Sequence, residues 1–326
     1  MNKRSSRRPA FIGIDIGGTK TLGVVLNENG ELLEDCVLST PQGSTDIAEL
    51  VTSIYLRLSD TVTQTPRDAH QVSSLGIGIA GLVDDRGLLH RAPNLVEADG
   101  LDIRHLVEPT IGVPVYVDND VNCAALAEIT SGAATGTNNA LLVTLGTGIG
   151  GALIVDGGIY RGAFGMAGEP GHMTVNPNGL TCACGRDGCW EAYASAAGLR
   201  NLAIKRAQDG KLDHVSRAVH GDLEHIASEH ITQAAKQGDV QSLAVIDEFA
   251  RWVAIGLTNC AALLDPELII VGGGLVAEWE LLGDRICSSF DEMLLASDQR
   301  NRIALKPAQN GTAAGAIGAS LLGRQR

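Results

Sequence analysis

The chain's architecture is set by Phe11-Ile12-Gly13-Ile14-Asp15-Ile16-Gly17-Gly18-Thr19-Lys20, a short apolar run that ends in a paired-glycine turn. A second apolar run, residues 22–26, follows and leads to Asn29-Gly30, a dipeptide typical of hairpin turns. The pattern predicts a strand, a glycine turn and a second strand. Glycines at such a turn let backbone N–H groups approach an anion, and Thr19 and Lys20 could add a hydroxyl and a charge. For this stretch alone, a tight hairpin without a ligand stays an open alternative.

The same design recurs about 130 residues later. Residues 141–145 lead into Gly146-Thr147-Gly148-Ile149-Gly150-Gly151, and a second apolar run, residues 152–155, ends in another turn. Two copies indicate two related lobes, each with a phosphate-sized turn. The glycines also spell the dinucleotide fingerprint Gly-x-Gly-x-x-Gly. That fingerprint requires a helix after the turn, and residues 152–155 are typical of a strand, so we discount a nicotinamide cofactor.

Polar residues and glycines follow three further predicted strands. Residues 113–117 meet Asp118-Asn119-Asp120 where a helix begins, and residues 72–79 end in Ala80-Gly81. In open α/β sheets, ligands bind at such carboxyl ends. Helix capping explains any one of the three polar residues, but all three together need another reason. Residues 268–271 run into Gly272-Gly273-Gly274, where backbone can lie close to a flat ligand such as adenine.

Three cysteines and a histidine lie within eighteen residues, at His172, Cys182, Cys184 and Cys189. Three thiolates and one imidazole match a tetrahedral Cys₃His zinc site. A disulfide is the alternative, but an odd number of thiols fits an ion better than it fits pairing. With four protein ligands the ion keeps no open position, so we predict a structural zinc.

Composition bounds the classes of protein that the chain can be. The 326 residues suggest two domains, and the net charge of -13 with only 3% aromatic residues argues against binding nucleic acid. The basic start is interpreted as a tail, and no run reaches the length of a membrane helix. Four isolated cysteines in apolar contexts are predicted to be buried free thiols: Cys36, Cys123, Cys260 and Cys287. Together these features predict a cytoplasmic protein.

In order and spacing, these motifs resemble the ROK family of sugar kinases and repressors, and within it the bacterial ATP-dependent glucokinases. The resemblance covers about residues 10–323 and rests most specifically on Cys182-x-Cys184-Gly185-x-x-Gly188-Cys189-x-Glu191. It implies an α/β protein with the actin-like ATPase (ribonuclease H-like) fold, two α/β lobes around a central cleft. We expect a small lobe over residues 10–120, completed by a C-terminal helix at 312–323, and a large lobe over 121–311 that carries the zinc-binding loop.

The resemblance also implies roles for individual residues. Asp120 resembles the general base, and Asp15 is a plausible Mg²⁺ partner. Because Asp120 stands near a helix N-terminus, we expect its charge to be stabilised there. The expected sugar-binding residues are Gly81, Asn94, Asn119, Asp120, Glu169, His172 and Glu191. The expected nucleotide-binding residues are Asp15, Gly17, Gly18, Thr19, Lys20, Gly146, Thr147, Gly148, Gly273 and Gly274. His172 would serve both the zinc ion and the sugar.

The expected activity is phosphorylation of a hexose, D-glucose at its 6-hydroxyl, by ATP and Mg²⁺ with a structural Zn²⁺. A kinase for N-acetylmannosamine, allose or fructose, a polyphosphate donor, and a sugar-responsive transcriptional regulator stay open as alternatives. Such regulators carry a helix-turn-helix domain ahead of the sugar module, and only about ten residues precede the first strand here. By analogy with relatives we expect a homodimer or homotetramer, with no nucleic-acid or membrane partner.

Overall fold

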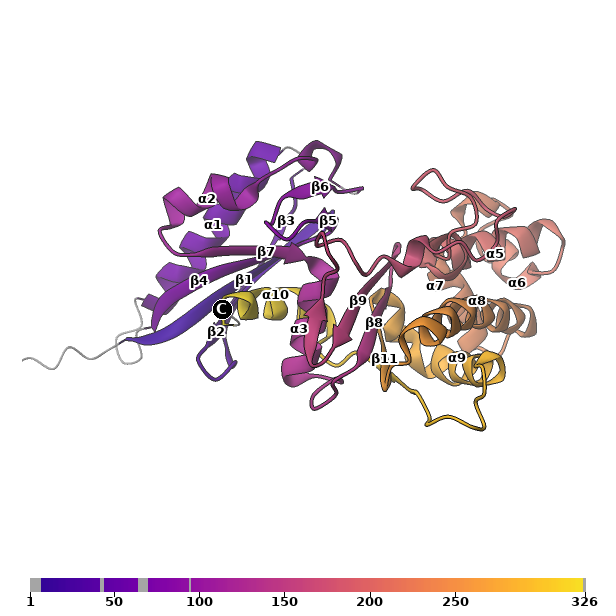
Figure 1. Cartoon of the computed structure of the whole chain (residues 1–326). Helices are drawn as coiled ribbons and strands as arrows, with labels where there is room; N and C mark the ends of the chain where they lie inside the picture. Colours follow the sequence, from indigo (N-terminus) through magenta and orange to yellow (C-terminus); the bar gives the residue numbers. More distant parts are fainter. Residues whose placement is uncertain (1–6, 42–43, 64–69, 94, 325–326) are drawn as a thin grey trace, which may run out of the picture. The chain divides into compact units, whose positions relative to one another are not determined.

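The structure is a computed structural model, and it describes residues 7–41, 44–63, 70–93 and 95–324. Contacts between Cα atoms divide the chain into two compact units (Figure 1). Unit 1 comprises Met1–Gly136, Ala152–Ala167 and Gln309–Arg326, and unit 2 comprises Thr137–Gly151 and Gly168–Ala308. This division differs from the expected boundary at residue 120, because the helix that begins there and residues 152–167 group with unit 1. Within the described parts of the chain, no helix has the length and apolar character that crossing a bilayer requires.

Unit 1 is built on a five-stranded sheet with the order β3-β2-β1-β4-β7. Its strands are β1 (Arg8–Ile16), β2 (Lys20–Asn27), β3 (Leu32–Ser39), β4 (His70–Ile79) and β7 (Val115–Asn119). The predicted first hairpin is confirmed, since β1 pairs with β2 in antiparallel register. Strands β1, β4 and β7 are parallel, so their carboxyl ends share one edge of the sheet.

Helices cover both faces of this sheet (Figure 1). They are α1 (Ser44–Thr63), α2 (Ile103–Ile111), α3 (Asp120–Ser131) and α10 (Ala314–Leu321). Apolar side chains of α1 and α2 share one buried cluster with the inward side chains of β1 and β4, among them Ile12 and Ile77. On the opposite face α10 lies directly on the strands, because a side chain at Gly13 or Gly76 would collide with its backbone. The small residues of α10 therefore permit the close packing that the sequence indicates.

The remaining elements of unit 1 are short. They are β5 (Leu82–Val83), β6 (Leu89–Arg91), β10 (Gly158–Tyr160) and the 3₁₀ turns at Val96–Ala98, Gly311–Ala313 and Leu322–Arg324. Near the end of the chain the Arg324 guanidinium lies 5.3 Å from the centre of the Phe11 ring, and its Nη2 donates to the Glu28 carbonyl at 2.7 Å. These contacts hold Arg324 against β1 and against the turn after β2.

Unit 2 contains the second predicted hairpin, β8 (Ala140–Leu145) and β9 (Ile149–Val155), and the chain passes into unit 1 within β9. Strand β9 follows the glycine turn, as the sequence pattern predicted, and no helix begins there. A second sheet has the order β10-β9-β8-β11-β12, in which β11 (Leu268–Gly272) runs parallel to both β8 and β12 (Ala304–Pro307). The helices of unit 2 are α4 (Glu191–Ala194), α5 (Ala196–Gln208), α6 (Asp213–Ala218), α7 (Ser228–Lys236), α8 (Val240–Leu264) and α9 (Trp279–Met293).

One predicted helix of unit 2 is interrupted. The sequence pattern indicates a continuous helix over residues 191–208, but the chain breaks at Ser195, whose backbone is extended. The Ser195 hydroxyl oxygen accepts from the Gly198 N–H at 3.1 Å and so caps α5. A side chain at Gly198 would collide with the Tyr193 backbone, which shows how closely the two short helices meet. Short 3₁₀ turns complete the unit at Pro170–His172, Leu223–His225 and Gly274–Glu278.

Candidate active site

In unit 1, the predicted sugar-binding and catalytic residues meet at the carboxyl ends of the parallel strands. Register places Ile16 of β1 beside Ile79 of β4, and Ile79 beside Asn119 of β7. The turns that follow these strands therefore lie at one sheet edge, the place where open α/β sheets bind ligands. The Asn119 side-chain amide donates to the Gly81 carbonyl at 3.1 Å, which directly joins two predicted sugar-binding positions.

Asn119 is the N-cap of α3. Its Oδ1 accepts from the N–H groups of Val121 at 2.8 Å and Asn122 at 3.1 Å. The capping role that the sequence left open for these polar residues is thus the role of the Asn119 oxygen. The side-chain amide has two N–H bonds: one is donated to Gly81, and the amide also hydrogen-bonds to the carboxyl group of Asp120.

Asp120 is the first residue of α3 and the predicted general base. Burial raises the pKa of its carboxyl group, although the backbone N–H groups of Val121 and Asp120 and the Asn119 side chain act in the opposite direction. Sequence reasoning expected the helix N-terminus to stabilise the charge. That expectation was wrong in its net effect, because the loss of hydration outweighs the nearby N–H dipoles.

Asp15, at the end of β1, belongs to the same acidic group. Burial first, and then the negative charge of Asp120, raise the pKa of the Asp15 carboxyl from 3.8 to about 7. The carboxylate lies against α10, where a side chain at Gly315 would collide with it. Two neighbouring desolvated carboxyl groups suit a hard divalent cation, because Mg²⁺ prefers oxygen ligands and its positive charge would neutralise theirs. The residues present therefore fit a magnesium ion.

The turn between β1 and β2 carries the nucleotide-binding residues predicted in unit 1. The Gly17 N–H donates to the Lys20 carbonyl at 3.0 Å and closes the turn, and the Thr19 carbonyl accepts from Thr40 N–H. The Thr19 and Lys20 residues are exposed, so their hydroxyl and ammonium groups are accessible. The turn thus presents a donor and a cation to solvent, as binding a phosphate requires.

In unit 2, Glu191 connects the second glycine turn to the cysteine loop. Its Oε2 accepts from the Ile149 N–H at 2.9 Å, and its Oε1 lies 3.5 Å from the Cys182 sulfur. A side chain at Gly148 would collide with the same carboxylate. A side chain at this position would displace the Glu191 carboxylate, so the turn of residues 146–148 lies directly against Glu191.

Gly273 lies beside this turn as well. Strand β11 pairs with β8 so that Gly272 is opposite Thr144, and Gly273 follows with a φ of 84°. A side chain at Gly273 would meet the Leu145 backbone. Two of the predicted nucleotide-binding turns, residues 146–148 and 273–274, consequently lie together within unit 2.

The four predicted zinc ligands converge in the loop before α4. One ligand atom from each of His172, Cys182, Cys184 and Cys189 lies within 4.8 Å of all the others. The Cys184 and Cys189 sulfurs are 3.6 Å apart, and Nδ1 of His172 is 3.9 Å from the Cys182 sulfur. A tetrahedral ion with Zn–S bonds of about 2.3 Å separates its ligand atoms by about 3.8 Å, so these spacings fit zinc. The cysteines are free thiols, and the disulfide alternative is not adopted.

The electrostatics of the cysteine loop also suit a metal ion. Burial raises the pKa of Cys184, but hydrogen bonds from the Arg186 backbone and side chain and from the neighbouring thiols outweigh it and lower the value to about 7. Burial raises the pKa of Cys182 to about 12, and the pKa of Cys189 is also raised. One thiolate is therefore available near neutral pH, and the other two thiols need a cation to ionise.

Glu169 immediately precedes the short 3₁₀ turn Pro170–His172, which ends at His172 and packs on the β8–β9 hairpin. The His172 N–H donates to the Glu169 carbonyl at 3.2 Å, and a side chain at Gly171 or Gly151 would collide with the other segment. Because Nδ1 of His172 faces the cysteines, its Nε2 is left to meet another group. This arrangement is consistent with the double role expected for His172.

The predicted site residues therefore form two sets. Unit 1 holds Asp15, Gly17, Gly18, Thr19, Lys20, Gly81, Asn119 and Asp120. Unit 2 holds Gly146, Thr147, Gly148, Glu169, His172, Cys182, Cys184, Cys189, Glu191, Gly273 and Gly274. Asn94 lies outside the described residues.

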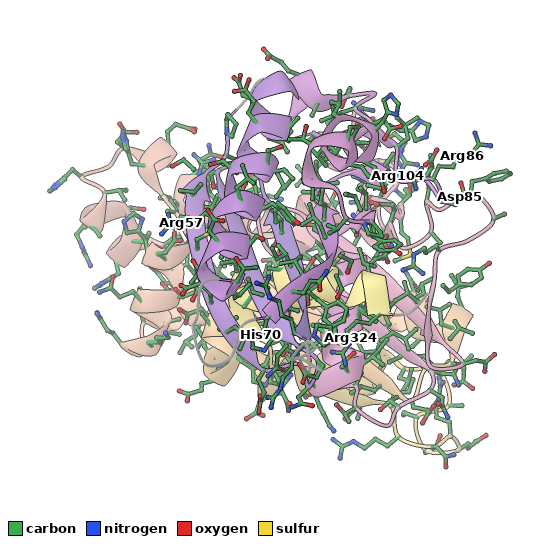
Figure 2. The ribbon with its side chains drawn as sticks, turned by 90° about the vertical axis from the view of Figure 1, so that its left-hand side faces the viewer. Arg57, His70, Asp85, Arg86, Arg104 and Arg324 are labelled. Atoms are coloured by element: carbon green, nitrogen blue, oxygen red, sulfur yellow. The ribbon has the colours of Figure 1, made fainter. Side chains whose placement is uncertain are left out.

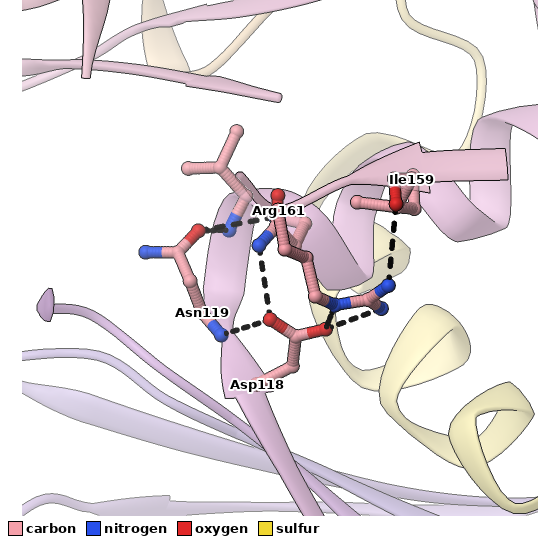
Figure 3. A network of polar contacts seen from close by, with 6 residues as sticks. Asp118, Asn119, Ile159 and Arg161 are labelled. Carbon is pink, nitrogen blue, oxygen red and sulfur yellow. Dashed lines mark hydrogen bonds and ion pairs between the residues drawn. The ribbon is translucent and has the colours of Figure 1, made fainter. Parts of the chain in front are cut away.

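Sequence reasoning missed the partners of Asp118. It noted this carboxylate as part of a polar cluster, but the structure pairs it with Arg161, 43 positions away in the chain (Figure 3). No local spacing links these two residues, so no motif could have identified the pair. A buried-strand position occupied by a carboxylate was the one available signal, because a buried charge needs a partner.

Known proteins share this chain's sequence and fold. The family model described as "ROK family" matches residues 11–326. The glucokinase of Streptomyces coelicolor is 37% identical over 317 residues, 96% of this chain and 97% of that protein. The xylose repressor of Bacillus spizizenii is 29% identical over 310 residues, 95% of this chain and 75% of the repressor. A crystal structure of a ROK family glucokinase from Streptomyces griseus, in complex with glucose and AMPPNP, superimposes with a TM-score of 0.83 at 38% identity, covering 97% of this chain and 100% of that chain.

These similarities extend over nearly the whole chain. Together with the mixed α/β sheets, they confirm the predicted fold class, the actin-like ATPase fold. The cysteine signature, the two glycine-turn hairpins and the acidic edge of unit 1 occur in one sequence that the family model matches from β1 onward. The chain therefore belongs to the ROK family.

Proposed function

We propose that this protein phosphorylates D-glucose at its 6-hydroxyl with ATP and Mg²⁺. The enzyme class follows from the family and its relatives: the chain is an ATP-dependent sugar kinase. Beyond this class, we propose which sugar is the substrate, which of its hydroxyl groups is phosphorylated and which residues act in the reaction. It includes a structural Zn²⁺ and a homodimer or homotetramer in the cytoplasm.

Asp120 carries the proposal. Its carboxyl group is desolvated at the carboxyl end of β7, at the sheet edge that also presents Asp15 and Gly81. A raised pKa makes a carboxylate a stronger base than an exposed aspartate. In the proposed reaction it orients the sugar hydroxyl and accepts its proton as the oxygen attacks phosphorus.

The remaining site residues hold the two substrates. Asn119 joins Gly81 and Asn94 in binding sugar hydroxyls, and Glu169, His172 and Glu191 are the further sugar-binding residues. The phosphates meet the two glycine turns, and the adenine lies along residues 273–274. Phosphoryl transfer asks the protein mainly for positioning and charge neutralisation, which these groups provide.

Magnesium and zinc have separate places in the proposal. Asp15 would hold Mg²⁺, directly or through water, and the ion when bound would neutralise phosphate oxygens. His172, Cys182, Cys184 and Cys189 would hold Zn²⁺ as a closed structural site. His172 would then be oriented by the ion, with its other ring nitrogen directed at the sugar.

The test is a panel of sugars assayed against ATP and polyphosphate by release of ADP or sugar phosphate. The panel contains glucose, N-acetylmannosamine, allose and fructose. We expect glucose with ATP to give the highest kcat/KM. A higher value for another sugar would replace the substrate, and turnover with polyphosphate alone would replace the donor.

The role of Asp120 is tested separately with Asp120→Asn and Asp120→Ala. Both variants should lose sugar-dependent ADP formation by about 10²-fold or more, because the proton acceptor is removed. Asp60→Asn is the matched control, since Asp60 is an exposed residue of α1 in the same unit. Wild-type turnover in a folded Asp120→Ala variant would refute the assignment.

A second candidate function is sugar-responsive regulation without catalysis. The similarity to the xylose repressor is the observation that favours it. A regulator would bind sugar but form no sugar phosphate. The panel distinguishes the two functions, because calorimetric binding of a sugar without any turnover would support the regulator.

A further inference from the structure

A buried carboxylate stands immediately before the predicted catalytic residues. Asp118 lies in β7, and 6% of its surface is exposed. Its Oδ2 accepts from Nε of Arg161 at 2.8 Å and from Nη2 of the same guanidinium at 2.6 Å (Figure 3). Its Oδ1 accepts from the Asn119 backbone N–H at 2.8 Å and from the Asn122 side-chain amide at 2.9 Å.

These four contacts join three segments of unit 1. Asp118 and Asn119 end β7, Asn122 lies in the first turn of α3, and Arg161 directly follows β10. A buried carboxylate keeps its charge only when donors replace the water it has lost, and here all four donors come from residues fixed in the fold. The orientation of the peptide between Asp118 and Asn119 is therefore tied to the guanidinium of Arg161.

Both the side chain and the backbone of Arg161 are held by further hydrogen bonds. Its Nη1 donates to the Ile159 carbonyl at 3.3 Å, while its own carbonyl accepts from the Ala167 N–H at 3.0 Å. Residues 161–167 thus form a closed loop whose last residue immediately precedes Gly168 and Glu169 in the chain. A side chain at Gly165 would collide with the backbone of Asp84 and Asp85, so the loop also packs closely within unit 1.

We propose that Asp118 and Arg161 are a positioning pair for the phosphoryl-transfer reaction, because they hold Asn119 and Asp120 in place against the loop of residues 161–167 within unit 1. The pair touches neither substrate. It acts by fixing the backbone from which the base and the sugar-binding amide project. This inference rests on the proposed function, because it takes Asp120 as the base and Asn119 as a sugar-binding residue.

A cavity beside the pair makes the inference testable by chemical rescue. It has a volume of about 220 Å³ and is lined by Asp118 and Arg161 together with residues of the loop after β5 and of α2, including Arg86 and Arg104. Figure 2 shows Asp85, Arg86 and Arg104 on one side of the unit. A small guanidinium cation can enter a cavity of this size and take the place of a deleted arginine head group.

Arg104 offers the matched control. It lines the same cavity, is half-buried, and makes no ion pair among the residues that the structure describes. Truncating it removes an arginine of equal size and charge from the same cavity without breaking a contact to Asp118. The comparison of Arg161→Ala with Arg104→Ala therefore separates loss of positive charge from loss of positioning.

The experiment measures kcat and both KM values for wild type, Asp118→Asn, Arg161→Ala, Arg161→Lys and Arg104→Ala. We expect kcat to fall about 10²-fold in Asp118→Asn and Arg161→Ala, because small misplacement of a reacting group has this effect. Arg161→Lys keeps the charge but has no second coplanar donor, so it should be intermediate. Arg104→Ala should match wild type, and the KM for ATP should change little in all variants.

The decisive measurement is turnover in the presence of added methylguanidinium. It should raise the turnover of Arg161→Ala several-fold and leave Asp118→Asn and Arg104→Ala unchanged. Full activity in the Asp118→Asn and Arg161→Ala variants, or no rescue of a folded Arg161→Ala variant, would overturn the proposal. If Arg161→Ala does not fold, Arg161→Lys and Asp118→Asn decide the matter by the same kinetic criterion.

Hydrogen exchange keeps the inference distinguishable from the proposed function. In Asp118→Asn the amides of residues 119–122 and 161–167 should exchange faster than in wild type, whatever the substrate. An inactive wild-type protein would count against the proposed function alone. Unchanged exchange in both segments would count against the positioning pair, even if glucose is phosphorylated.

Discussion

At the scale of single residues, two opposing effects act on the pKa of the Asp120 carboxyl group. Asp120 stands at the first position of α3, where backbone N–H groups favour its ionised form. Its surroundings remove water from the carboxyl group, and this effect determines the direction of the pKa shift. Because a general base works best with a pKa nearer the working pH, burial improves Asp120 for the role we propose.

The pH dependence of catalysis follows from this shift. Only ionised Asp120 can accept a proton, so kcat/KM for the sugar should fall as the pH falls through the raised pKa. We expect the acidic limb of the profile to lie clearly above 3.8, the ordinary aspartate value. Circular dichroism at each pH shows whether the protein stays folded. Undiminished kcat/KM down to pH 4 in folded protein would contradict the raised pKa.

At the scale of elements, the end of α3 is held by Glu128, which is fully buried. Its Oε1 accepts from the N–H groups of Gln309 at 3.0 Å and Asn310 at 2.8 Å and from the Asn310 side chain at 3.1 Å. Its Oε2 accepts from the Ala133 N–H at 2.7 Å. One side chain thereby binds two segments that lie next to points where the chain passes between the units, after Gly136 and before Gln309.

Replacing Glu128 should destabilise unit 1. In Glu128→Gln one oxygen becomes an NH₂ group that faces an N–H donor, and in Glu128→Ala all four donors lose their acceptor. We expect the free energy of unfolding to fall by about 3 kcal/mol or more in the alanine variant. Urea unfolding followed by circular dichroism measures the change. The control Glu49→Gln, on the exposed side of α1, should stay within about 0.5 kcal/mol of wild type.

The cysteine loop is the other element whose stability can be tested. Fresh protein should contain about one zinc per chain, and chelation or Cys184→Ser should remove it and lower the melting temperature, because metal binding is coupled to folding of the loop. Cys287→Ser is the control, since Cys287 is a half-buried thiol of α9 in the same unit. Active protein without zinc, found by elemental analysis, would remove the proposed site.

At the scale of the whole molecule, net charge limits the partners. The formal charge of -13 disfavours association with a phosphate backbone. This matters because the family also includes repressors, one of which is similar to this chain over 310 residues. Charge and aromatic content therefore favour an enzyme over a DNA-binding regulator.

Retention on immobilised DNA tests that conclusion. We expect the full chain to pass through a DNA column at low salt, where electrostatic binding is strongest. A known DNA-binding protein of similar size serves as the positive control for the column. Retention that decreases steeply with added salt would favour the regulator and would require the sugar-phosphate assay to be interpreted again.

Sequence alone determined the local features, because each depends on neighbours in the chain. The two hairpins follow from apolar runs interrupted by glycines, and the zinc ligands follow from cysteine spacing within one loop. The sequence also indicated helix capping as a role for any one of residues 118–120, and Asn119 is the cap. The exception is the break at Ser195, where a side-chain cap outweighs a helical pattern that would otherwise continue.

Tertiary structure decided everything that depends on distant residues or on lost water. The pairing of Asp118 with Arg161, the acceptor role of Glu128 at Gln309 and Asn310, and the direction of the Asp120 pKa shift have no sequence pattern. The physical reason is that hydration and ion pairing depend on which atoms surround a charge in space. Spacing along the chain reveals which residues are neighbours in a turn or a loop, but only the folded units show which charges are buried together.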